Sequence, residues 1–135
     1  MAALIDTSLW IDLTRSRSPR PLKALIAPHV NDPEACLCEP IAFEVLRYAT
    51  DAEVRQLTRY FETLPLLSSP DNLWSQGAEL GRACRRKGVT VGSLDLLIAI
   101  VALHHAAELV TFDAGFQEIG GVSGLRVKLL HRPTT

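Results

Sequence analysis

The chain has 135 residues, of which 47% are hydrophobic and 21% are charged, and its formal net charge at pH 7 is −1. This length and composition indicate one globular domain over residues 1–135 and exclude a strongly basic nucleic-acid-binding protein. The longest apolar run, residues 96–103, is far shorter than the roughly 20 residues that cross a bilayer. We therefore expect a soluble protein with no membrane partner and no signal peptide.

Segments typical of strands alternate with segments typical of helices along the chain. This alternation predicts an α/β fold with a mostly parallel sheet and helices on both of its faces. In chain order we predict a strand at 2–5, helices at 8–14 and 21–27, a strand at 35–38, helices at 39–49 and 51–64, a short strand within 64–67, helices at 71–87 and 93–106, a strand at 109–111, a turn with one short helix over 113–120, and a strand at 125–130.

Several helix ends carry their usual signals. Thr7 or Ser8 is a suitable N-cap for the first helix, Ser93 for the helix at 93–106, and Gly88 suits the end of the helix before it. The helix at 93–106 is apolar on nearly every side, so we expect other elements to cover it all round.

The three cysteines, Cys36, Cys38 and Cys84, form neither an even set nor a CxxC pair. Free thiols in the reducing cytoplasm explain this pattern better than a disulfide framework or a zinc site does. We therefore predict a cytoplasmic protein.

Four acidic residues occupy positions that a parallel sheet brings together. Asp6 follows the first strand, Glu44 lies in the helix after the second, Asp95 is in the first turn of the apolar helix, and Asp113 comes just past the fourth strand. Because ligands bind outside the carboxyl ends of the strands in open parallel sheets, we expect these carboxylates to converge there.

Each acid also has a purely structural explanation. Asp6 can accept a hydrogen bond from an amide at the start of the first helix, and Asp95 can favour the positive end of its own helix. Asp113 can form an Asx turn, and Glu44 can be partly exposed.

Taken together, the four acids favour a metal site. Carboxylates gathered without cations repel one another, and their pKa values rise. Mg²⁺ and Mn²⁺ prefer oxygen ligands, remove that repulsion and activate water for in-line displacement at phosphorus. The pattern therefore suits metal-assisted cleavage of phosphodiester bonds.

Two clusters of basic residues accompany the acids. For each cluster alone, a solvated surface is the simpler explanation. The first cluster is Arg15, Arg17, Arg20 and Lys23, and the second is Arg82, Arg85, Arg86 and Lys87.

The segments DTSLWIDL, CEPIAFEVL, SLDLLIAIVAL and LVTFDAGF resemble, in order and spacing, those of PIN-domain ribonucleases, and most of all the VapC-type toxins of bacterial toxin–antitoxin pairs. The resemblance extends from Leu4 to about Leu130. It implies a PIN-like α/β/α sandwich with a mostly parallel central sheet. It also implies an Mg²⁺- or Mn²⁺-dependent endoribonuclease that forms a homodimer and is neutralised by a cognate VapB-like antitoxin.

Carried over by position, the resemblance assigns the catalytic and metal-binding acids to Asp6, Glu44, Asp95 and Asp113. It assigns supporting roles to Thr7, Ser8 and Thr111. The chain departs from the pattern at Gly115, where many relatives have a further acid, so we expect one firmly held ion.

The mechanism that we expect follows from these assignments. Asp6 and Asp95 hold the ion, directly or through water, while Asp113 and Glu44 complete the pocket and orient the attacking water. The water attacks a phosphorus of single-stranded RNA, and the cluster Arg82, Arg85, Arg86 and Lys87 positions the RNA backbone. An Arg or Lys of the antitoxin blocks the acidic pocket.

The sequence leaves three other functions open. A PIN-like module that only binds RNA or protein would share the fold. A receiver-like signalling domain would need paired acids after the first strand, where Thr7 stands instead. A haloacid-dehalogenase-like phosphatase would need DxDxT, and the chain has DTSLW.

Overall fold

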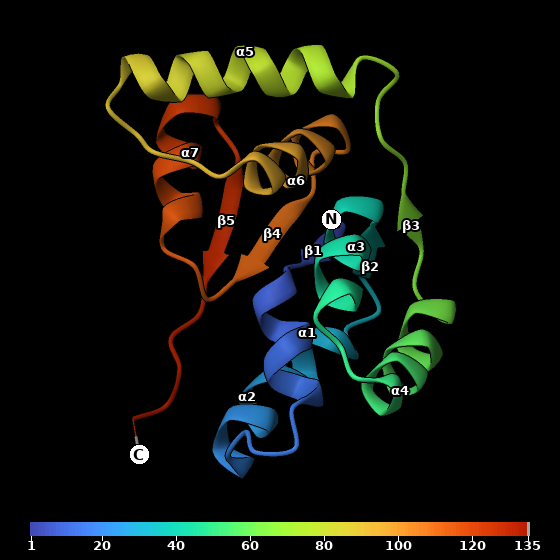
Figure 1. The fold of residues 1–135 in the computed structure, drawn as a ribbon. Helices are drawn as coiled ribbons and strands as arrows, with labels where there is room; N and C mark the ends of the chain where they lie inside the picture. Colours follow the sequence, from blue (N-terminus) through green and yellow to red (C-terminus); the bar gives the residue numbers. More distant parts are fainter. Residues whose placement is uncertain (135) are drawn as a thin grey trace.

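The computed structural model describes residues 1–134 and is organised around a five-stranded sheet (Figure 1). Each pair of neighbouring strands is parallel, in the order β3-β2-β1-β4-β5. This arrangement confirms the predicted α/β fold with a parallel sheet. The strands are β1 (Ala3–Ile5), β2 (Ala35–Cys38), β3 (Leu66–Leu67), β4 (Glu108–Thr111) and β5 (Arg126–Leu129).

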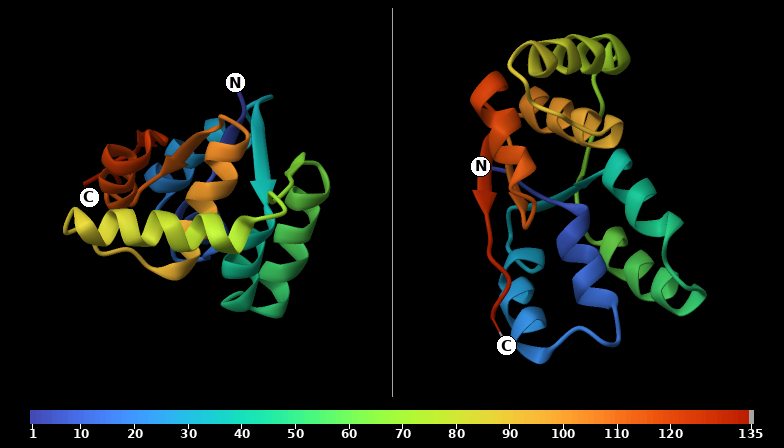
Figure 2. Two further views of the ribbon diagram at one scale, coloured as in Figure 1. Left: turned by 90° about the horizontal axis from the view of Figure 1, so that it is seen from above. Right: turned by 60° about the vertical axis from the view of Figure 1, so that its left-hand side comes forward.

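Most helices fall into two groups, one on each side of the sheet, while α3 packs against a helix of each group, α1 and α6 (Figures 1 and 2). Helices α1 to α4 connect β1, β2 and β3, and the other three connect β3, β4 and β5. The strand order runs outward from β1 in both directions, so right-handed crossovers place the two groups on opposite faces. The helices are α1 (Thr7–Thr14), α2 (Arg20–Val30), α3 (Glu39–Arg47), α4 (Asp51–Glu62), α5 (Leu73–Arg86), α6 (Ser93–His104) and α7 (Gly115–Ser123).

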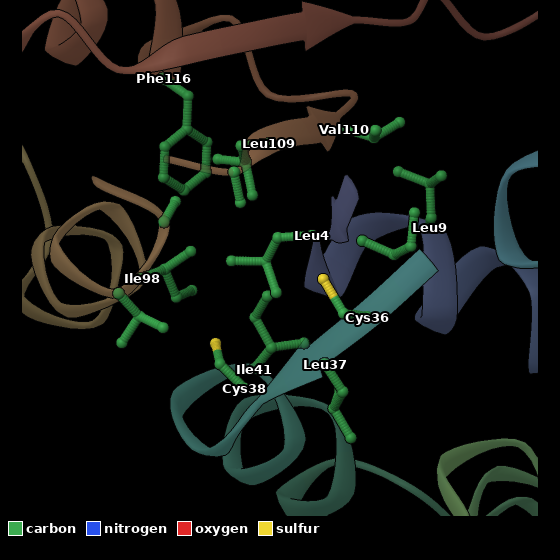
Figure 3. Packing of buried hydrophobic residues seen from close by; sticks show 14 of the residues in the cluster. Leu4, Leu9, Cys36, Leu37, Cys38, Ile41, Ile98, Leu109, Val110 and Phe116 are labelled. Carbon is green, nitrogen blue, oxygen red and sulfur yellow. The ribbon is translucent and has the colours of Figure 1, made fainter. Parts of the chain in front are cut away.

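The hydrophobic core lies on both faces of the central strands. Leu4 of β1 and Leu109 of β4 are register partners, and both are fully buried. Figure 3 shows Leu109 beside Phe116 of α7, whereas Val110 lies toward Leu9 of α1. Successive strand residues point to opposite faces, so each three- or four-residue strand supplies apolar side chains to two helix layers.

Two predicted helix caps are wrong. The N-cap of α1 is Asp6, and that of α6 is Gly92, in place of the predicted Thr7 or Ser8 and Ser93. Neither cap residue makes a side-chain cap hydrogen bond, and the Asp6 carboxylate bonds to other partners described below. Asp6 thus occupies the cap position of α1 while its carboxylate bonds to side chains outside the cap.

The predicted end of α5 at Gly88 is confirmed. Gly88 has a φ of +74°, a left-handed conformation that glycine adopts without strain. The Val89 N–H donates to the Cys84 carbonyl at 2.9 Å, and the Gly88 N–H donates to the Arg85 carbonyl at 3.0 Å. These two bonds form a Schellman motif, which turns the chain toward α6.

Two helices are longer than predicted because burial continues beyond the local stop signal. Helix α2 passes through Pro28 to Val30, which is buried on the same stripe as Ile26. Helix α7 extends to Ser123 because Phe116 and Ile119 pack into the core. Within residues 1–134, no helix combines the length and apolar character that spanning a bilayer requires.

Candidate active site

The candidate site lies where the strand order reverses. Asp6 directly follows β1, Thr111 ends β4, and the two strands are neighbours. The Asp6 N–H donates to the Val110 carbonyl at 3.0 Å, so the pairing of the strands reaches the acid itself. Open parallel sheets bind ligands at such a switch point, at the carboxyl ends of the strands.

Asp6 is a buried carboxylate with two hydroxyl partners. Its side chain is 4% exposed, and its Oδ2 accepts hydrogen bonds from Thr111 Oγ1 at 2.7 Å and Ser8 Oγ at 3.1 Å. Burial raises the pKa of Asp6, while the bonds from Thr111, the Thr7 backbone and Ser8 lower it. The hydroxyls therefore stabilise a charge that the interior would otherwise disfavour.

The same hydroxyls hold the loop that carries Asp113. Thr111 Oγ1 accepts the Asp113 N–H at 2.9 Å, and Ser8 Oγ accepts the Phe112 N–H at 3.3 Å. One relay of hydrogen bonds thus runs from the Asp6 carboxylate through two hydroxyls to two backbone amides. It fixes the position of the loop relative to Asp6.

Asp113 is exposed and forms the Asx turn that was one of its expected alternatives. Its Oδ1 accepts the Gly115 N–H at 2.8 Å. A Cβ at position 115 would lie 3.1 Å from that oxygen. An acidic side chain at position 115 would therefore require the Asp113 carboxylate to shift, so glycine there suits this turn.

Asp95 and Glu44 approach the site from α6 and α3, and both are partly buried. The pKa of Asp95 is raised to about 6, first by burial and then by the charges of Asp6, Asp113 and Glu44. A helix N-terminus would lower the pKa of a carboxyl group, so burial and repulsion outweigh it here. The four predicted acids are thus close enough to interact electrostatically.

The four acids are not arranged as a complete set of metal ligands. Within residues 1–134, no group of three or more Asp, Glu, His or Cys side chains has a geometry that could hold a metal ion. The donor chemistry nevertheless fits a hard divalent cation, because the four groups are carboxylates that repel one another. Ion binding would require some of these side chains to rotate inward.

Thr7 contributes through its backbone. Its N–H lowers the pKa of Asp6, whereas its hydroxyl is buried and has no hydrogen-bond partner within residues 1–134. The predicted support from Thr7 is therefore limited to the amide in this structure.

The basic cluster lies one loop away from Asp95. Its four members are exposed at the end of α5, and Arg85 lines a hollow of about 330 Å³ with Val89, Thr90 and Val91. The loop that contains these three residues leads directly into α6. The members of the cluster are Arg82, Arg85, Arg86 and Lys87.

An apolar hollow beside the site was not predicted. It has a volume of about 380 Å³ and lies between α3, α5 and α6. Its lining includes Phe43 and Trp74, whose exposed fractions are 58% and 75%. Phe43 precedes Glu44 on α3, and Leu94 precedes Asp95 on α6, so the hollow is lined from the same two helices that carry these acids. In the sequence, the only sign of this hollow is that Phe43 and Trp74 occupy positions where the helical pattern predicts polar residues.

Residues 3–122 of the chain match the PIN domain family. The chain belongs to this family. Over 129 residues it is 36% identical to VapC ribonuclease Mb1587 of Mycobacterium bovis and to ribonuclease VapC11 of Mycobacterium tuberculosis. Each alignment covers 91% of this chain and 95% of the relative. The predicted resemblance to VapC-type PIN-domain ribonucleases is thus confirmed.

Solved structures confirm the fold. The TM-score is 0.75 against VapBC2 from Rickettsia felis bound to a DNA fragment from its promoter, at 17% identity over 96% of this chain and 99% of that one. It is 0.65 against VapBC-5 from Mycobacterium tuberculosis, at 24% identity over 96% of this chain and all of that one. At these identities the likeness shows that the PIN-like α/β/α sandwich is shared.

We expect Thr111→Val to lower the free energy of unfolding at pH 7 by about 2 kcal/mol, because the buried Asp6 carboxyl group loses its shortest hydrogen bond and the Asp113 N–H loses its acceptor. The Thr111 bond lowers the pKa of Asp6, so it stabilises the ionised form. The loss should therefore be largest above the folded-state pKa of Asp6 in the variant, which is higher than in the wild type, and should shrink as the pH falls through the two values. Denaturant melts across pH measure this dependence.

Thr14→Val is the matched control. Thr14 is equally a buried threonine, but its hydroxyl donates to the Trp10 carbonyl at 2.9 Å and to no charge. We expect a loss of about 1 kcal/mol that does not depend on pH. Equal, pH-independent losses in both variants would contradict the account of Asp6.

Proposed function

We propose that this chain is the toxin of a type II toxin–antitoxin pair and acts as an Mg²⁺- or Mn²⁺-dependent endoribonuclease. The observation that carries the proposal is the coupling of Asp6, Glu44, Asp95 and Asp113 at the switch point of a PIN fold. The 36% identity to proteins named VapC ribonucleases supports it. The proposed substrate is single-stranded RNA, and the products arise by hydrolysis of a phosphodiester bond.

Asp6 and Asp95 are the proposed principal metal ligands. Both hydroxyl bonds to Asp6 fall on Oδ2, so they leave Oδ1 for another partner. Asp95 has no hydrogen bond that lowers its pKa, so its carboxyl group can turn toward Asp6 without losing one. Bound Mg²⁺ or Mn²⁺ would supply a Lewis acid for the phosphoryl oxygens and a nucleophilic water at neutral pH.

The remaining groups orient the reactants. Asp113 is held by its turn to Gly115, and Glu44 faces the same cluster from α3, so the two can accept hydrogen bonds from the attacking water. The exposed basic cluster Arg82, Arg85, Arg86 and Lys87 can neutralise backbone phosphates without reading bases. A PIN-like module that only binds RNA or protein is the alternative, and it predicts no metal-dependent cleavage.

Asp95→Asn tests the role of the acids. The pKa of Asp95 is about 6 in the fold against an ordinary value of 3.8, so the free energy of unfolding falls as the pH rises from about 4 to about 6. At pH 7 in EDTA, Asn should raise it by about 1 kcal/mol, a figure discounted for partial exposure. With Mg²⁺ the wild type should gain stability by mass action, and the variant much less. Thermal melts in both buffers measure this.

RNA cleavage is measured on the same proteins. The wild type should cut total RNA with Mg²⁺ or Mn²⁺ and not with EDTA, and Asp95→Asn should lose activity by orders of magnitude. Asp51→Asn removes the same charge from the exposed first turn of α4, so it should be neutral or slightly destabilising and fully active. An Asp95→Asn protein that melts lower in EDTA and still cuts RNA would refute the assignment.

The proposed protein partner is a VapB-like antitoxin that covers the acidic pocket. The similar structures of VapBC2 from Rickettsia felis and VapBC-5 from Mycobacterium tuberculosis support a partner of this kind. Because four acids without an ion favour a cation, we expect an Arg or Lys of the antitoxin to lie among them. Replacing that residue by Glu should restore cleavage by the purified complex, while the same change at a distant basic residue should not. An inhibited complex with an open pocket would contradict this.

We also propose that the chain forms a homodimer through Phe43 and Trp74. Trp74 lies between the hollow of about 380 Å³ and a second one of about 230 Å³, so this surface offers both a protruding side chain and hollows to receive one. A two-fold interface needs such self-complementarity. Two aromatic side chains bury about 300 Å² or more, a substantial part of the about 800 Å² per partner of a standard interface.

Light scattering at micromolar concentration should show a dimer of the wild type. Trp74→Glu should shift it to monomer, because a charge cannot be buried unpaired in an apolar interface. Tyr48→Glu is the control, since Tyr48 is 67% exposed but does not line either hollow. A monomeric wild type, or a dimer that survives Trp74→Glu, would exclude this interface.

A further inference from the structure

The chain after β5 leaves the sheet at the edge that carries the acids (Figure 1). The Leu130 N–H donates to the Thr111 carbonyl at 2.8 Å, so this segment starts beside the end of β4. Two residues later, Arg132 Nε donates to Asp12 Oδ2 at 2.8 Å, and the Arg132 Cζ lies 4.6 Å from the centroid of the Phe112 ring. Arg132 therefore contacts both α1 and the loop after β4.

These contacts hold the guanidinium on two segments that also carry residues of the candidate site. Phe112 lies between Thr111 and Asp113 in the chain, and its N–H donates to Ser8 Oγ in the relay that holds Asp6. Asp12 is on α1, the helix that Asp6 starts, and its side chain is only 13% exposed. Arg132 is thus oriented by an ion pair on one side and an aromatic ring on the other.

The guanidinium keeps donors for a ligand. Arginine has five N–H donors, and the bond to Asp12 uses only the one on Nε. The Arg132 side chain is 52% exposed, so its terminal nitrogens can be reached from solvent. A planar guanidinium that stacks on an aromatic ring and presents a free edge is well suited to bind a phosphate with two parallel hydrogen bonds.

We propose that Arg132 binds a backbone phosphate of the RNA beside the scissile one and so positions the strand over the acids. This inference rests on the proposed ribonuclease function. Four carboxylates repel an approaching polyanion, so a cation fixed at their rim determines where the strand lies. Arg132 fills this role better than the basic cluster on α5, because two contacts already restrict its orientation.

The test compares Arg132→Ala with Arg126→Ala. Arg126 is also exposed, and it is the first residue of β5, the strand after which Arg132 follows, so its loss changes the net charge equally at the opposite edge of the sheet. The substrate is a labelled single-stranded RNA oligonucleotide of mixed sequence. Cleavage with Mg²⁺ gives kcat and KM, and fluorescence anisotropy in EDTA at several salt concentrations gives the salt dependence of binding.

For Arg132→Ala we expect KM to rise roughly fivefold to tenfold with little change in kcat. The slope of log binding constant against log salt should become shallower by about 0.7, the value of one phosphate contact on a single strand. Arg126→Ala should leave both quantities near wild type. Arg132→Lys should keep the slope and raise KM only partly, because a point charge replaces the fork.

Asp12→Asn separates phosphate binding from a purely structural clamp. If Arg132 only ties the tail to α1, Asp12→Asn and Arg132→Ala should lower the melting temperature and kcat together without changing the salt slope, which would overturn the proposal. If Arg132 binds phosphate, Asp12→Asn should keep the slope. Equal slopes and KM for Arg132→Ala and Arg126→Ala would also overturn it. A wild-type protein that neither binds nor cuts RNA would refute the proposed function itself.

Discussion

The buried Asp6 carboxylate and its two hydroxyl partners are the interaction on which the rest of the site depends. A charge at 4% exposure is tolerated only if it is hydrogen-bonded, and Ser8 in the first turn of α1 and Thr111 at the end of β4 meet that need. Because each hydroxyl also accepts a backbone N–H of the loop after β4, satisfying Asp6 simultaneously orders Phe112 and Asp113. The charge and the loop are thus stabilised by the same atoms, which explains why two small polar side chains occupy a largely apolar sheet edge.

The fold supplies the setting for this interaction. The strand order runs outward from β1 in both directions, so the ends of β1 and β4 meet without a crossing helix above them. Asp95 enters from α6 and Glu44 from α3, two helices that pack against each other, and their charges remain uncompensated among the described residues. Asp6 is held by its hydroxyl partners, so it defines where an ion would bind. Asp95 is less constrained, and its repulsion by the other acids determines how much stability that ion would return to the fold.

The sequence was sufficient for the parts of the structure that depend on chain order and periodicity. Strands alternating with helices predicted the parallel sheet, and acids at strand ends predicted their approach at one edge. The cap of α1 was mispredicted because the Asp6 carboxylate bonds to Thr111, 105 residues away, a contact that local sequence preferences cannot reveal. The start of α6 at Gly92 has no such explanation. The length of α7 depended on the burial of Phe116, and the exposure of Trp74 depended on which face of α5 meets α6. The contacts of Arg132 required the register of β5 against β4, since a shift of one residue would turn the following segment to the other face.

Phosphate binding by Arg132 would resolve a conflict that the acidic site creates. A pocket that attracts a divalent cation repels the RNA backbone, and the exposed cluster at the end of α5 offers attraction without a defined orientation. Arg132 is restrained by Asp12 and Phe112, so it loses less conformational entropy on binding than a free surface arginine does. Its partner Asp12 is on the helix that starts at Asp6, and Phe112 precedes Asp113. The cation that receives the strand and the acids that act on it would then be held by the same two segments, so their spacing would be fixed by the hydrogen bonds that make the buried Asp6 tolerable.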